Sequence, residues 1–173
     1  LSGEGGLVWQ KWRNGNTSDH WLHDTVRGNQ LSLATNSSQA AENHSPNSLK
    51  SFNSNGYTIG SYFGTNPLVG WTFRKAPKFF DIVTYTGNST SGRQIAHNLG
   101  AVPGMMIIKK TSGSGGWRTY HRGANGGTNP ENYYADLNDT AAFSSLASVW
   151  NQTAPTATHF TLGDQIHVNQ NGQ

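Results

Sequence analysis

Two stretches of the sequence, Gly6-Leu7-Val8-Trp9-Gln10-Lys11 and Gly104-Met105-Met106-Ile107-Ile108-Lys109, decide how the chain is interpreted. Each consists of a glycine, four mostly apolar residues and a lysine. Other segments recur in the same order: Trp21 and Trp117, each followed by an Arg-Gly pair, and then residues 57–60 and 160–163. Self-similarity at a nearly constant separation indicates internal duplication, and small drifts in the separation are typical of loop insertions.

We therefore expect two related repeats, residues 1–75 and residues 76–173. The boundary falls at Arg74-Lys75-Ala76-Pro77-Lys78, because proline cannot continue a central strand. The first repeat lacks its first strands, since residues 79–86 have no counterpart ahead of Leu1. The second lacks its last strand, the counterpart of 68–74. We expect the natural polypeptide to be longer at both ends, or the sheet edges to be completed by another chain.

The chain is rich in short segments of Val, Ile, Thr, Trp, Tyr and Phe, separated by turns such as Asn55-Gly56. This pattern predicts an all-β fold, an antiparallel sandwich or barrel. The predicted strands are 7–12, 20–26, 31–35, 48–53, 57–61, 68–74, 79–86, 93–97, 105–111, 117–122, 133–138, 147–151 and 158–163. One short helix is expected in each repeat, at 38–42 and at 140–146.

Composition excludes several classes of protein. Charged residues are 12% of the chain, against a usual value of about 25%, and the net charge of +3 is spread thinly. Nucleic-acid binders cluster Lys and Arg on one face, so no nucleic-acid partner is expected. No apolar run approaches the roughly 20 residues of a membrane span, so no membrane insertion is expected. Cysteine is absent, which excludes disulfides and thiolate metal sites.

Candidate catalytic and metal sites are weak. His20 and His23 would point to opposite faces of a strand, and no further zinc ligand has matching spacing, so no metal or other cofactor is expected. A glycosidase needs two facing carboxylates, and neither of the nearest pairs, Asp19 with Asp24 or Asp136 with Asp139, is compelling. Asp24 is instead expected to form an ion pair with Arg27 at a hairpin end.

The six tryptophans carry the best functional signal. Trp9, Trp71 and Trp150 lie in apolar contexts and are predicted to be core residues. The others, Trp12, Trp21 and Trp117, lie beside polar turns, where an exposed indole suits the apolar face of a sugar ring. The alternative is that these rings cap the edge of the sandwich. The predicted glycan-binding residues are Trp21, His23, Trp117, Tyr120 and His121.

Several motifs resemble a repeat family of virion structural proteins from marine bacteriophages, including those of cyanobacteria. The motifs that carry the resemblance are Tyr85-Thr86-Gly87-Asn88, His97-Asn98-Leu99-Gly100 with Pro103, Met105 to Lys109, Asp24-Thr25-Val26-Arg27-Gly28, Ser51-Phe52-Asn53-Ser54-Asn55-Gly56-Tyr57-Thr58-Ile59-Gly60 and Val69-Gly70-Trp71. The resemblance implies a tail fibre, appendage or capsid decoration protein, a jelly-roll or concanavalin-like sandwich, and no catalytic residues. The second repeat departs from the pattern, with Tyr120-His121-Arg122-Gly123 in place of the Asp-Thr-Val-Arg-Gly element.

The resulting expectation is a non-enzymatic structural module at the virion surface, outside the cell. Its expected partners are other virion subunits, including copies of itself, and its exposed loops could also attach to a glycan on the host surface. Three alternatives remain open: a lectin-like adhesin selected for glycan capture, a depolymerase of capsular polysaccharide, and a bacterial surface adhesin with the same repeats.

Overall fold

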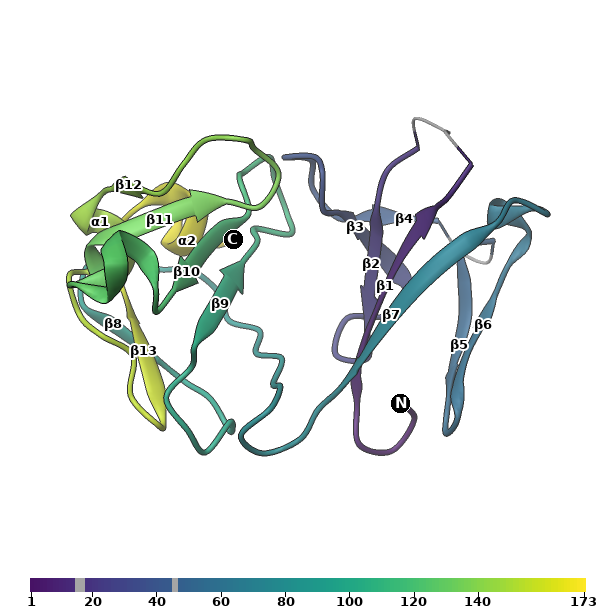
Figure 1. The fold of residues 1–173 in the computed structure, drawn as a ribbon, viewed down its shortest axis with the longest axis horizontal. Coiled ribbons are helices and arrows are strands. Elements are labelled where there is room, and N and C mark those ends of the chain that lie inside the picture. Colours follow the sequence, from purple (N-terminus) through teal and green to yellow (C-terminus); the bar gives the residue numbers. More distant parts are fainter. Residues whose placement is uncertain (15–17, 45–46) are drawn as a thin grey trace.

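The computed structural model describes residues 1–14, 18–44 and 47–173. The fold is mostly β, with antiparallel sheets and two short α-helices. Figure 1 shows two halves side by side, joined below by the segment that follows β7. The first half contains β1 (Gly6–Trp12), β2 (Trp21–Asp24), β3 (Gly28–Ala34), β4 (Glu42–Asn43), β5 (Leu49–Asn53), β6 (Gly56–Ile59), the 3-10 helix η1 (Ser61–Phe63) and β7 (Leu68–Arg74).

The second half repeats this plan with changes. It contains β8 (Arg93–Ala96), β9 (Met105–Ile108), β10 (Arg118–His121), the 3-10 helices η2 (Ala124–Gly127) and η3 (Pro130–Asn132), β11 (Tyr133–Asp136), β12 (Ser144–Ser145), α1 (Ala147–Trp150), β13 (His159–Leu162) and α2 (Ile166–Asn169).

Each half has one main sheet and one two-stranded sheet. The main sheets run β4-β3-β2-β1-β7 and β12-β11-β10-β9, and the small ones pair β5 with β6 and β13 with β8. Within the described residues, none of these sheets closes into a barrel. None of the described helices combines the length and the apolar character needed to cross a membrane.

Strand alternation decides which face of the first sheet is covered. Val8 and Gln10 are fully buried, whereas Leu7 and Trp9, which alternate with them, are only half-buried. Val8 packs with Leu49 of β5, so one face of the sheet is covered by the β5–β6 hairpin. The opposite face looks toward the second half (Figure 1).

Most predicted strands are present within a few residues of their expected bounds, but two predictions are wrong. Residues 79–86 form no ladder, apart from an isolated bridge between Ala76 and Phe80. Within this segment, Val83 and Tyr85 pack against the hydrophobic core of the second half. Residues 147–151 contain the helical turn α1. Val149 and Trp150 are adjacent and both buried, which a helical turn allows and an alternating strand with one solvent face does not.

Neither predicted helix forms. Around 38–42, the Ser37 hydroxyl accepts the Gln39 N–H, and Glu42 already belongs to β4. Around 140–146, Asp139 accepts the main-chain N–H groups of the two residues that follow it, and all seven residues are exposed. Such local side-chain bonds compete with helix formation, and a short segment without a buried face gains no packing that would offset them.

The two halves use the same hydrogen bonds at corresponding places. Thr25 N–H donates to the Gly6 carbonyl at 3.0 Å, and Arg122 N–H donates to the Gly104 carbonyl at 2.9 Å. We call residues that hold the same place in these ladders and bonds counterparts. The lysines that follow, Lys11 and Lys109, are therefore counterparts too.

This correspondence corrects the predicted register of the tryptophans. The His20 N–H donates to Asn36 Oδ1 at 2.8 Å. The Trp117 N–H donates to Asn138 Oδ1 at 2.9 Å. His20 is therefore the counterpart of Trp117, and the pairing of Trp21 with Trp117 is wrong by one residue. The difference matters, because a shift of one residue moves a side chain to the other face of a sheet.

A pair of glycines marks the same close approach in both halves. Gly60 N–H donates to the Ser48 carbonyl, and Gly163 N–H donates to the Val149 carbonyl. A Cβ atom at Gly60 would run into the Asn47 carbonyl, and one at Gly163 would run into the Ser148 carbonyl. Only glycine permits this crossing of two chain segments.

The halves meet where the turn after β3 lies against the segment before β10. The indole N–H of Trp117 donates to the carbonyls of Ala34 and Ser37, at 3.1 and 3.0 Å. Gly115 N–H donates to the Ser38 carbonyl, and a further main-chain bond joins residues 41 and 111, both at 2.8 Å. These bonds hold the second half against the first at one end of their contact.

Candidate functional site

The face of the first sheet that lies opposite the β5–β6 hairpin carries an aromatic hollow of about 380 Å³, at the β1–β7 edge of the sheet. We call it the β1–β7 hollow. Its lining residues are Trp9, Lys11, His20, Trp71 and Phe73. Strand alternation explains the set, because Trp9 lies directly opposite Trp71 in the ladder and Leu7 opposite Phe73, all on one face.

The two indoles form the floor of the hollow. Their ring centroids are 5.8 Å apart, with a tilt of 55°. Trp9 is held by a hydrogen bond from its Nε1–H to Thr35 Oγ1 at 3.0 Å. Trp71 lies on the edge strand β7 and is 46% exposed. The hollow therefore offers one fixed ring and one that is open to solvent.

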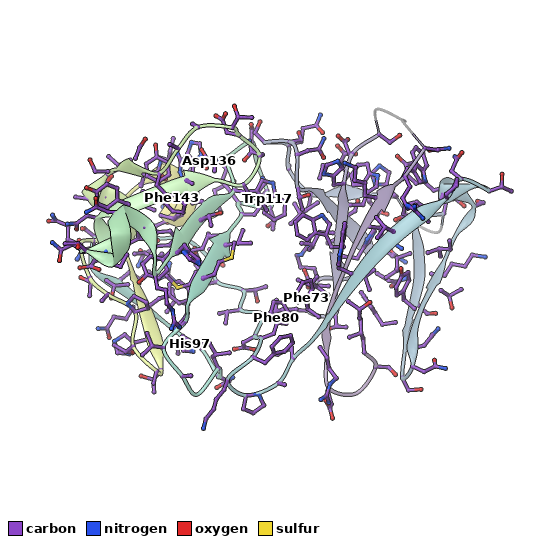
Figure 2. All side chains as sticks on the ribbon, in the orientation of Figure 1. Phe73, Phe80, His97, Trp117, Asp136 and Phe143 are labelled. Carbon is purple, nitrogen blue, oxygen red and sulfur yellow. The ribbon has the colours of Figure 1, made fainter. Side chains whose placement is uncertain are left out.

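Figure 2 shows Phe73 and Phe80 together at the base of the space between the halves. Phe73 comes from β7 and Phe80 from the joining segment, and their ring centroids are 5.6 Å apart. Trp117 is labelled on the second half, on the side that looks toward the first (Figure 2). The hollow thus opens into the region between the halves.

Two basic side chains complete the hollow. Lys11 is exposed, and His20, directly before β2, is half-buried. Burial lowers the pKa of His20, the Lys11 ammonium lowers it further, and the Asp19 carboxylate opposes both. His20 is therefore mostly neutral at neutral pH and can both donate and accept a hydrogen bond. Among the residues that the structure describes, no carboxylate lines the hollow.

The sequence-predicted glycan residues do not form a surface site. Trp21, His23, Trp117 and Tyr120 are all buried, with exposed fractions of 5%, 0%, 3% and 3%. Only His121 is exposed, and its Nδ1 accepts the Gly123 N–H. A ring must be open to solvent to stack on a sugar, so the exposure that this prediction required is absent at four of its five residues.

The buried residues have structural partners instead. Trp21 packs with Phe63 in the first half, and His23 Nε2 lies 2.7 Å from Ser48 Oγ. Tyr120 packs edge-on against Trp150 at 6.0 Å. Trp117 lies in the contact between the halves and has a structural role there, as the alternative of rings that cap the edge of the sandwich would have it.

The hollow was not predicted from the sequence, because residues 68–73 form an apolar run typical of a buried strand, and Trp9 and Trp71 were expected to be core residues. Trp150 is buried as predicted, but Trp9 is only half-buried and Trp71 is exposed. The signal was the alternation of Gly70 and Thr72 with the bulky residues of β7. A Cβ at Gly70 would run into the Tyr57 hydroxyl. Gly70 and Thr72 therefore face the hairpin, whereas Trp71 and Phe73 line the hollow.

The predicted ion pair between Asp24 and Arg27 is confirmed, with Nε and Oδ2 2.6 Å apart. His20 and His23 lie on opposite faces of the first sheet, as expected. Among the described residues, no group of three or more His, Cys, Asp or Glu side chains is placed to hold a metal ion.

The family described as Domain of unknown function (DUF7483) matches residues 2–173. The chain belongs to the DUF7483 family. No curated protein and no solved structure matches the chain. For this DUF7483 chain, function has to be argued from its own residues, and the β1–β7 hollow and the exposed sheet edges are the features that carry the argument.

Proposed function

We propose that this chain is a non-enzymatic structural module of a phage particle, exposed at the particle surface and assembled with other virion subunits, including copies of itself. The single observation that carries the structural role is the set of hydrogen bonds that the two halves have in common, which supports two related repeats, residues 1–75 and 76–173. The assignment to a phage particle rests on the motif resemblance alone.

The arrangement of the sheets in each half supports a finer proposal for the fold. In each half a main sheet faces a small two-stranded sheet across a core, with antiparallel strands throughout. That arrangement favours a β-sandwich of jelly-roll or concanavalin-like type. The sandwich would act as a rigid block, with recognition left to exposed residues.

The lining of the hollow supports a non-enzymatic role. Glycoside hydrolysis in most families requires an acid and a second carboxylate across the scissile bond. The hollow offers three aromatic rings, a lysine and a histidine. These groups can bind a ligand, but they do not supply that pair.

Sedimentation of the purified chain over a range of concentrations, combined with a reducing-sugar assay on host polysaccharide, tests the proposal. We expect the mass to rise with concentration and no sugar to be released. A chain that stays monomeric at every concentration, or that releases reducing ends, contradicts it.

A second candidate function, glycan capture, is favoured by the Trp9–Trp71 pair. The exposed ring of Trp71 can stack on a sugar while Lys11 and His20 meet its hydroxyls. We expect Trp71→Ala to abolish retention of the chain on immobilised host polysaccharide. Phe143→Ala, which removes an exposed ring from the second half, is the matched control and should leave retention unchanged. Equal retention of both variants contradicts this candidate.

A further inference from the structure

Each half contains a strand that the other lacks. Among the described strands, β1 lies between β2 and β7 in the first main sheet, whereas its counterpart β9 has only β10 beside it. In the small sheets the second half has a strand that the first lacks: β13 pairs with β8, while its counterpart β6 pairs, within the described part of the chain, only with β5. Because β6 and β13 are counterparts, their partners β5 and β8 lie either on the same edge or on opposite edges of the strand.

The alternation of hydrogen bonds along β6 defines its free edge. Gly56 faces Asn53 across the two-residue turn of the hairpin, and Thr58 faces Ser51. Residues in an antiparallel strand direct their main-chain groups to alternate sides. Since Gly56 and Thr58 bond toward β5, Tyr57 and Ile59 direct their N–H and C=O groups away from it.

The second half shows what belongs at that edge. Counting back from the matched glycines, Tyr57 is the counterpart of Phe160, and Ile59 of Leu162. The His97 N–H donates to the Thr158 carbonyl at 2.9 Å. By alternation, Phe160 and Leu162 therefore also bond toward β8. The edge that β8 covers on β13 is the edge that stands free on β6.

The first half, which has no counterpart of β8 among its described strands, also has smaller core clusters. In the second half a single cluster of seven buried residues includes Ile95 of β8, with Val83 and Tyr85 packed against it. Among the described residues of the first half, the buried apolar clusters are two, with three residues each. Both amide atoms of the Gln10 side chain are buried with no hydrogen-bond partner among the described residues.

The free edge itself lacks the features that usually prevent pairing. Residues Gly56-Tyr57-Thr58-Ile59 contain no proline and no charge, and Ile59 is 37% exposed. Exposed apolar edges without such protection are ready templates for another strand. In strand addition, main-chain bonds supply affinity and the pockets for alternate side chains supply selectivity.

We propose that the free edge of β6 is a strand-acceptor site for an extended, β8-type segment of a neighbouring subunit. The incoming strand runs antiparallel to β6 and bonds to the main chain of Tyr57 and Ile59. It inserts an apolar side chain opposite Tyr57, as Ile95 lies opposite Phe160. This inference rests on the proposed structural role and names the contact through which subunits join.

The test uses the full chain and a synthetic peptide with the sequence of residues 81–98. We expect the peptide to bind, to slow amide hydrogen exchange at Tyr57 and Ile59, and to raise the unfolding temperature. A peptide carrying Ile95→Asp should bind at least about tenfold more weakly, because it places a charge in the core. Absence of binding, protection of β9 in place of β6, or equal binding of the Asp peptide overturns the proposal.

Two variants of the chain sharpen the result. Ile59→Pro removes the N–H that points away from β5 and should weaken peptide binding about tenfold, the equivalent of one lost hydrogen bond. Ile59→Val keeps that N–H and should bind as the parent does. Slow exchange at Ser51 in both variants shows that the β5–β6 hairpin is intact; if the proline variant unfolds, the Asp peptide and the exchange pattern decide. Peptide binding requires no self-association, so failure here leaves the proposed function standing, and a monomeric chain can still bind the peptide.

Discussion

The indole N–H of Trp117 donates to the main-chain carbonyl of Ala34, 3.1 Å away and 83 residues earlier in the chain. The same N–H also reaches the Ser37 carbonyl. One side chain of the second half thus anchors a turn of the first half by two hydrogen bonds.

Replacement of this indole should weaken the whole molecule. Trp117→Phe removes both bonds and should lower the free energy of unfolding by about 1–3 kcal/mol, measured by chemical denaturation. Hydrogen exchange at Ala41, which donates across the same contact, should accelerate. Trp71→Phe alters an exposed ring and should change stability by less than about 0.5 kcal/mol. A Trp117→Phe variant as stable as the parent would show that the contact contributes nothing.

The buried His23 makes stability depend on pH. Burial lowers its pKa from 6.5 to about 4, with Arg27 and His44 adding to the effect and Asp24 opposing it. The unfolded chain therefore takes up the proton first as the pH falls. The stability contribution is complete above pH 6.5 and is lost as the pH falls through the window from 6.5 to about 4, by roughly 3 kcal/mol in total.

Thermal unfolding between pH 7.5 and pH 4 measures this slope. His23→Gln, which cannot titrate, should flatten the slope, whereas His121→Gln at an exposed position should retain the slope of the parent. If the first variant keeps the full slope, another group is responsible for the pH dependence.

The matched glycines predict a pair of equivalent defects. Gly60→Ala and Gly163→Ala each place a methyl group against a main-chain carbonyl, which cannot move aside easily. Each should destabilise the chain by about 1–3 kcal/mol, read from denaturant midpoints. In Gly104→Ala the nearest atoms belong to the Arg122 guanidinium, the end of a flexible side chain, so this control should cost less. Equal costs at all three positions would contradict the proposed role of the close approach.

The ion pair of Arg118 with Asp136 should be costly to break from one side. Arg118 is 7% exposed, and its guanidinium lies 4.3 Å from the centre of the Tyr134 ring. Asp136→Asn leaves that cation without its counter-charge and should cost about 2–4 kcal/mol, less than a fully enclosed pair would.

Removing both charges supplies the control. The double variant Arg118→Met with Asp136→Leu should recover most of the loss, because no unpaired charge remains buried. Equilibrium unfolding in denaturant compares the variants. A single variant as stable as the parent would mean that water reaches the guanidinium.

The sequence predicted the β class and most of the strands, because alternation and turn residues act locally. It failed where packing between distant segments decides. Residues 79–86 have strand composition but no ladder partner, and the order Val149-Trp150 does not reveal that both side chains enter one core. Trp21 and Trp117 looked alike by type, yet the matching hydrogen bonds to Asn36 and Asn138 make His20 the counterpart of Trp117. That single step in register separates a residue of the first core from the contact between the halves.

The candidate site was missed for the same kind of reason. Trp71 lies in an apolar run, but whether such a run is covered depends on its place in the sheet, and β7 turned out to be an edge strand. Trp9 and Trp71 are far apart in the chain and meet only through the pairing of β1 with β7. No local pattern predicts that pairing.

The turn after β3 is recognised mainly through main-chain carbonyl oxygens, at Ala34, Ser37 and Ser38. One side-chain contact accompanies them, between the hydroxyls of Ser114 and Ser38. Every amino acid carries such an oxygen, so these main-chain bonds do not depend on which residues occupy the turn, as long as the backbone keeps its path. The joint between the halves can therefore tolerate mutational drift at the exposed positions of this turn, such as Gln39, while Ala34 stays constrained by the core around it.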